Sequence, residues 1–147
     1  MKSLTFVPIL IIVAVIVMLS ANASAQFSPL TEEQLRASAT HVIRGSVSNV
    51  FVRTERKDNW EYTFGVVEVD VRQVSKGQDI EASDRVFVRY WHKTWLGDPT
   101  QIPSDHAGNE NIPSKGDTAD IFLMGDRQTG FDVFSPNGFF RVIPKSD

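Results

Sequence analysis

The sequence contains no cysteine. This absence excludes disulfide bonds, catalysis by a thiol, zinc sites built from thiolates and lipid attachment at a cysteine. Small exported domains often depend on disulfides, but a chain of this length can bury a sufficient hydrophobic core without them.

Positive charge is also scarce, because 15 Lys and Arg stand against 18 Asp and Glu, for a net charge of −3. General nucleic-acid binders need a basic surface that displaces counterions, so nucleic acid is not an expected partner. Catalytic signatures are missing too: the chain has no Gly-x-Ser-x-Gly motif, no phosphate-binding loop and no paired-carboxylate pattern. We therefore expect a protein that is not an enzyme.

The longest apolar run lies at the N-terminus. A short basic start precedes Leu4–Leu19, and the small residues of Ser20–Ala25 follow it with an Ala-x-Ala pattern. This order predicts a secretory signal peptide over residues 1–25. An uncleaved membrane anchor is the alternative, but it needs about 20 apolar residues, and Pro8 interrupts the run. We expect a periplasmic or extracellular protein, with no membrane span after cleavage and one domain over residues 26–147.

Glu61–Gly77 is the central strand of the expected fold. Its apolar residues occupy even positions up to Val66 and odd positions from Val67 onward. Each half has the two-residue period of a strand with one buried face. Because a β-bulge turns the alternation over, the switch beside Gly65 predicts a bulge there.

Two further long strands flank this one. His41–Arg53 alternates with a phase slip near Ser48 and Asn49, and the charged stretch Arg53–Asn59 is expected to be a solvated hairpin tip. Arg85–Trp95 is the third strand. Its even positions are smoother and more β-branched, so we assign them to the core: Val86, Val88, Tyr90, His92 and Thr94.

Shorter elements complete the chain. Thr31 and Gln34 match a capping box that starts a helix over about Glu32–Ala39. Thr118–Met124 is a fourth strand, and Phe131–Phe134 with Phe139–Ile143 form a final pair around a strong turn signal. Two strands that each carry a phase slip favour tight barrel closure. The fold class is therefore mostly β: a five- to six-stranded antiparallel OB-like Greek-key barrel with one short N-terminal helix.

Several short motifs resemble those of one family. Ala39–Val47 (ATHVIRGSV), Val74–Gly77 (VSKG), Val86–Tyr90 and Gly116–Leu123 (GDTADIFL) resemble pieces of netrin-like domains, the family that includes tissue inhibitors of metalloproteinases. The chain is also similar to small exported bacterial proteins of no established activity. The resemblance covers about Leu30–Met124 and implies a five-stranded OB-type barrel with helices against it.

One departure limits what this resemblance implies about function. The metalloproteinase inhibitors use an N-terminal cysteine that chelates the zinc of their target, with disulfides around it. Here the expected mature terminus is Gln26, and cysteine is absent. The resemblance therefore implies a fold and not that inhibitory mechanism.

The odd positions of the third strand are the candidate ligand-binding residues: Arg89, Trp91, Lys93 and Trp95. Alternating cations and indoles can stack on sugar rings and pair with anionic groups. Ordinary packing of this face under the helix or a loop is the other interpretation, because aromatic residues are mostly buried. If the face is a site, we expect a binding or interaction module for a glycan or a partner protein of the envelope or extracellular space.

Other candidates are weaker, and we expect no cofactor and no metal. The three histidines (His41, His92 and His106) are too scattered for a metal motif. The long irregular loop Leu96–Asp117 holds oxygen ligands without calcium-loop spacing, namely Asp98, Asp105, Asn109, Glu110 and Asp117. Ser104-Asp105-His106 are hydrolase residue types, but adjacency does not make a triad. Two alternatives stay open: a protease-inhibitor-like protein acting through Gln26–Pro29 or a loop, and a hydrolase built on His92 or His106.

Overall fold

The computed structural model describes residues 29–103 and 108–144. The elements are α2 (Glu32–Ser38), β1 (His41–Lys57), β2 (Trp60–Lys76), β3 (Arg85–Trp95), the 3-10 turn η2 (Pro99–Gln101), β4 (Thr118–Asp126), β5 (Gly130–Val133) and β6 (Phe139–Ile143). The capping box at Thr31 and Gln34 is formed as predicted. No helix within the described ranges is long and apolar enough to cross a bilayer.

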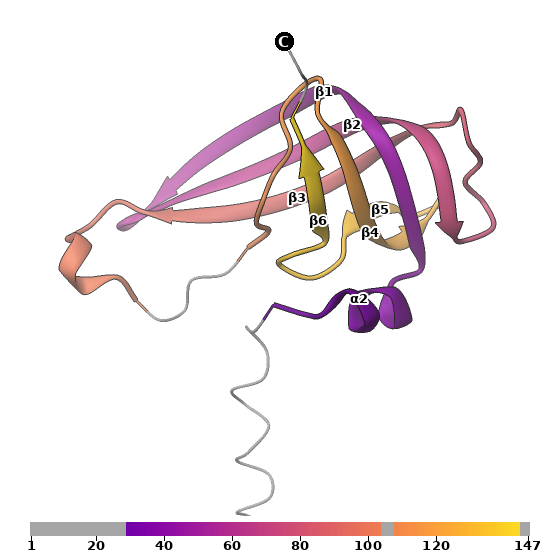
Figure 1. Cartoon of the computed structure of the whole chain (residues 1–147). Helices are drawn as coiled ribbons and strands as arrows, with labels where there is room; N and C mark the ends of the chain where they lie inside the picture. The colour runs from indigo at the N-terminus through magenta and orange to yellow at the C-terminus, as the bar shows by residue number, and fades with distance from the viewer. Residues whose placement is uncertain (1–28, 104–107, 145–147) are drawn as a thin grey trace, which may run out of the picture.

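Five strands close into a barrel. Their order is β1-β2-β3-β5-β4, and β4 pairs back onto β1 (Figure 1). The contact of β3 with β5 is parallel and the other pairings are antiparallel. This mostly-β arrangement confirms the expected OB-like barrel. β6 is an extra strand beside β4.

The last two strands do not pair with each other, so that prediction was wrong. β5 and β6 lie one after the other along β4, with Val133 opposite Leu123 and Ile143 opposite Thr118. The turn signal itself was correct, because Gly138 N–H donates to the carbonyl of Ser135. The turn carries the chain along β4, since β5 has to bridge β3 and β4 for the barrel to close.

The hairpin between β1 and β2 is much longer than predicted. Pairing continues to Lys57 opposite Trp60 and leaves only a tight turn at Asp58 and Asn59. The Arg53–Asn59 stretch is exposed as expected, but most of it is strand and not a loop. Charged side chains suit an exposed strand when they pair across it, as Arg56 does with Glu61 at 2.9 Å.

The predicted bulge at Gly65 is absent, because β2 passes this residue without a register shift against either neighbour. Gly65 is needed for a different reason: a Cβ here would lie 2.2 Å from the Tyr90 ring, which packs over the glycine. The predicted slip near Ser48 and Asn49 is confirmed by a register shift in β1 between Val47 and Asn49.

Without a bulge at Gly65, β2 keeps one phase from Thr63 to Val71. Its odd positions are buried from Thr63 to Val71, whereas its even positions lie on the opposite face. Phe64 and Val66, which the sequence pattern assigned to the core, therefore face away from it. Alternation alone could not reveal this, since both faces of β2 carry apolar residues.

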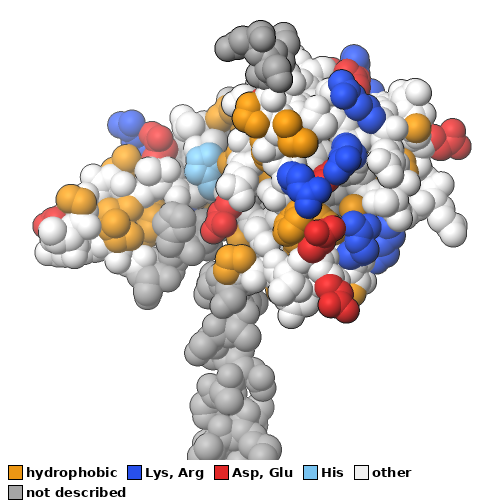
Figure 2. All heavy atoms as spheres, viewed as in Figure 1, with side chains coloured by type: hydrophobic (Ala, Val, Ile, Leu, Met, Phe, Trp, Pro, Cys, Tyr) orange, Lys and Arg blue, Asp and Glu red, His pale blue; other side chains and the backbone are white. Residues whose placement is uncertain are grey.

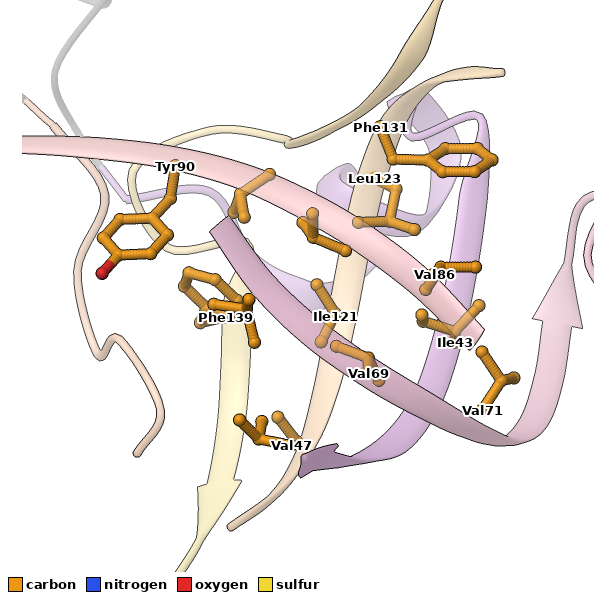
Figure 3. Packing of buried hydrophobic residues seen from close by; sticks show 14 of the residues in the cluster. Ile43, Val47, Val69, Val71, Val86, Tyr90, Ile121, Leu123, Phe131 and Phe139 are labelled. Carbon is orange, nitrogen blue, oxygen red and sulfur yellow. The ribbon is translucent and has the colours of Figure 1, made fainter. Parts of the chain in front are cut away.

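The barrel core is built from all six strands. Figure 3 shows its side chains pointing toward one another; the labelled ones are Ile43, Val47, Val69, Val71, Val86, Tyr90, Ile121, Leu123, Phe131 and Phe139. The even positions of β3 are buried as predicted as far as Tyr90, but His92 is half-buried and Thr94 is exposed. A second cluster joins Leu35 of α2 to Val42 and Phe122.

Beyond the barrel, three strands continue together as an arm (Figure 1). We define the arm as Phe51–Lys57 of β1, Trp60–Val66 of β2 and Arg89–Trp95 of β3, which are hydrogen-bonded to one another in register. Its middle strand is β2, so β1 and β3 form its edges. This extension positions the candidate site.

A buried histidine links three segments at the other end of the molecule. His41 is 5% exposed; its Nδ1 lies 2.9 Å from Thr40 Oγ1, and its Nε2 hydrogen bonds to Asp79. The second oxygen of Asp79 accepts from the backbone N–H of Arg127 at 3.2 Å. The network joins the start of β1, the β2–β3 connection and the β4–β5 turn. The hydrogen bond with His41 holds the pKa of the Asp79 carboxyl below its ordinary value.

Replacing Gly65 by alanine tests the close packing under Tyr90. We expect Gly65→Ala to lower the free energy of unfolding by about 1–3 kcal/mol, as overpacking of a core does. Urea denaturation measures the change. In a Tyr90→Ala background the clash is gone, so the cost should largely vanish; an equal cost in both backgrounds would contradict the assigned contact.

Acid titration tests the Asp79 network. Because its pKa is lowered in the folded state, Asp79 stabilises the fold above the unfolded value of about 3.9 and loses this contribution as pH falls below it. We expect Asp79→Asn to be less stable than the wild type at neutral pH, with the gap closing under acid. Denaturant unfolding at stepped pH measures both proteins, and a gap independent of pH would count against the network.

Candidate binding groove on the arm

A groove of about 950 Å³ lies on one face of the arm. The strand register places its side chains in two rows across β1, β2 and β3: Arg53–Phe64–Trp91 and Phe51–Val66–Arg89. Three of these are large hydrophobic side chains that remain open to solvent, namely Phe51 (50% exposed), Phe64 (38%) and Trp91 (41%). We refer to this surface as the groove.

The long loop supplies one wall of the groove. Asn109 is fixed against β3, since its Oδ1 accepts from Trp91 N–H at 3.0 Å and its N–H donates to the Trp91 carbonyl at 2.6 Å. Its amide also donates to the carbonyl of Ser135 at 3.0 Å, which holds Ser135 and Pro136 beside the groove. Asn109 therefore joins β3 to the Ser135–Pro136 segment, and the long loop forms part of the wall of the groove.

The two arginines of the groove are already paired with carboxylates. Arg89 donates to Asp132 through Nε at 2.8 Å and Nη2 at 2.7 Å, and this hydrogen bonding raises the pKa of Arg89. Arg53 lies 2.8 Å from Glu55 and 5.4 Å from the centre of the Phe64 ring. The groove is therefore an apolar surface edged by ion pairs and not a strongly cationic one.

The four residues predicted from the sequence separate into two pairs. Arg89 and Trp91 line the groove, whereas Lys93 and Trp95 pack with Trp60 further along the arm. Lys93 is 8% exposed, with Nζ 4.2 Å above the Trp60 ring. The Trp95 ring meets Trp60 edge-on at 5.0 Å, and its Nε1 donates to the carbonyl of Asp98. Ordinary packing thus describes the outer pair.

Four groove residues were not recognised in the sequence: Phe51, Arg53, Phe64 and Val66. The available signal was the apolar residues at even positions of β2, for which the alternation predicts a buried face. On β1, the charged stretch after Arg53 concealed a strand that continues to Lys57.

The remaining candidates have other contacts or lie outside the described residues. His92 is half-buried on the core-facing side of β3, with its ring stacked on Tyr90 at 6.3 Å. Asp98 and Asp117 accept from backbone N–H groups of their own loop at 2.8 Å. Ser104, Asp105 and His106 are outside the described ranges. Among the residues that the structure describes, no three His, Cys, Asp or Glu lie close enough to hold a metal.

A second hollow, of about 180 Å³, lies between α2 and the barrel. Arg44 and Arg141 reach Asp120 there at 2.5 and 3.5 Å. In Figure 2, basic and acidic side chains lie side by side over the barrel, and a patch of hydrophobic side chains lies on the arm. The larger, apolar groove is therefore the stronger candidate.

Comparison of the chain with known protein families, with curated proteins and with solved structures finds no match. The chemistry of the groove is therefore the basis on which a function is proposed.

Proposed function

We propose that this protein is an exported, non-enzymatic binding module that holds its ligand in the groove on the arm. The observation that carries the proposal is the exposure of Phe51, Phe64 and Trp91 within one hollow. Large apolar side chains gathered on a surface mark interaction sites, because leaving them in water costs free energy. The position also suits an OB-like barrel, whose second and third strands present the ligand-binding face.

A glycan is the ligand class that this surface favours. Indole and phenyl faces can stack on the apolar faces of sugar rings, while the ion pairs at the rim offer donors and acceptors to hydroxyl groups. Arg89 already has two hydrogen bonds with Asp132. A polyanion would compete with this carboxylate and approach its negative charge, so we favour a neutral glycan over a sulfated one.

Export rests on the signal-peptide pattern of residues 1–25, which lie outside the described ranges. The netrin-like resemblance is compatible with the OB-like barrel and stays a prediction. The protease-inhibitor alternative also stays a prediction, because it depends on Gln26–Pro29, of which the structure describes only Pro29.

Calorimetric titration with neutral oligosaccharides tests the proposal. Purified protein should bind at least one member of a panel of chitin- and cellulose-derived oligomers more tightly than a sulfated polysaccharide. Trp91→Ala and Phe64→Ala should each weaken binding by about tenfold, as expected when one stacking platform is lost. Trp95→Ala is the matched control, because Trp95 contacts Trp60 outside the groove.

Two results would count against the proposal. A panel that produces no saturable heat would remove glycans as the ligand class. Binding that survives both groove substitutions in folded protein would place the ligand elsewhere.

A further inference from the structure

Among the residues that the structure describes, no strand pairs with the outer edge of β1 along the arm. Within the described residues, Phe51–Lys57 pair with β2 alone, whereas the same edge earlier in β1 is covered by β4 over His41–Ser46 and by Gly116 and Asp117 at Val47. An edge strand presents free N–H and C=O groups to any other strand. Two exposed apolar residues lie on this edge, Phe51 at 50% and Val52 at 58%.

The charges along this edge alternate in sign. Arg53, Glu55 and Lys57 follow one another on the groove face of β1. Edge strands that avoid pairing often carry lysines or other repelling charges. An edge with charges of alternating sign does not repel every partner strand. It favours those partners and registers in which opposite charges face each other.

A second copy of β1 fits this series in an antiparallel arrangement. With Thr54 on the two-fold axis, Arg53 lies opposite Glu55 of the second copy, and symmetry makes this ion pair twice. Phe51 then lies opposite Lys57 of the second copy. On the other face Val52 meets Arg56 of the second copy, so no like charges oppose each other.

Two neighbouring antiparallel registers also place the groove faces of both copies on the same side of the sheet, but they are less favourable. Centring the pairing on Arg53 places two arginines in opposition. Centring it on Glu55 opposes two glutamates and also brings Arg53 against Lys57. The charge pattern of the edge therefore selects the arrangement about Thr54 over these two.

We propose that two copies of this chain pair antiparallel along Phe51–Lys57, with Thr54 at the two-fold axis. The two arms form one continuous six-stranded sheet, and both grooves lie on the same face of it. Lys57 of each copy lies beside Phe51 of the other, at the border of its groove. This pairing goes beyond the proposed function and does not require a bound ligand.

The pairing loses little that the single chain has. Arg53 and Glu55 form an ion pair within β1, but their side chains are 70% and 53% exposed. Such a pair contributes little to stability, so exchanging it for pairs across the interface costs little. The gain comes from burying Val52 and from backbone hydrogen bonds along an edge with which no described strand pairs.

Charge reversal on the edge tests the proposal. Sedimentation of the purified exported protein should show a monomer–dimer equilibrium. Arg53→Glu and Glu55→Arg should each weaken the dimer by about tenfold or more, because each sets like charges against each other twice. Mixing the two variants in equal amounts should restore a dimer, since Glu at 53 in one chain then faces Arg at 55 in the other and the second pair is unchanged.

The mixing step separates pairing between copies from effects within one chain. A change in the fold of either variant cannot be repaired by adding the other one. The combined Arg53→Glu/Glu55→Arg chain restores both pairs by itself and should also dimerise. Arg72→Glu, the same charge change on an exposed part of β2 away from the arm, is the control and should leave the dimer unchanged.

If sedimentation shows only monomer at every protein concentration, the proposal is overturned. The edge of β1 would then be available to a strand of another molecule, such as a partner peptide. A dimer that survives both single reversals, or a mixture that stays monomeric, would overturn it too. Calorimetric titration with glycans tests the proposed function separately. If the protein is monomeric but binds glycans through Trp91, the proposed function stands and only the pairing is overturned.

Discussion

The structure depends on the point at which β1 leaves the barrel. Pairing with β4 closes the barrel over His41–Ser46, and the backbone bonds from Val47 to Gly116 and Asp117 end this contact. Directly afterwards the register with β2 shifts, between Val47 and Asn49. From there on β1 has only β2 beside it, because within the described residues no other strand follows it outward. The free edge and the open groove are both consequences of this departure.

Apolar residues on both faces of β2 decide what the arm can do. Inside the barrel the odd face is covered by the core, and the even face carries Glu68 and Asp70. Along the arm the even face carries Phe64 and Val66 instead, with too little chain above them for burial. If this even face were only in contact with solvent, polar residues on it would make the protein more soluble. The exchange of acidic for apolar residues at the border of the barrel is therefore the feature on which the proposed binding surface depends.

The sequence predicted those features that are set by local rules. The capping box at Thr31, the third strand over Arg85–Trp95 and the slip near Ser48 all depend on neighbouring residues, and the structure has each of them. The bulge at Gly65 was wrong because Tyr90, which is distant in sequence, is the reason for the glycine. Periodicity identifies two faces of a strand but not which of them is covered. For this reason the alternation of β2 places Phe64 in the core, although it lies next to Trp91 in the groove.

The charged side chains of the arm affect its two proposed contacts, glycan binding in the groove and pairing of the β1 edges, in different ways. Three solvent-exposed ion pairs leave the surface of the arm close to neutral: Arg89 with Asp132, Arg53 with Glu55, and Arg56 with Glu61. A neutral glycan that stacks on Trp91 meets no net field, so added salt has little to screen. Two arms that align through ion pairs at their edges do depend on those charges, and salt weakens exposed pairs. In the two proposals the groove takes its affinity from apolar surface and the edge takes its register from charge, so ionic strength should act mainly on the pairing of the edges.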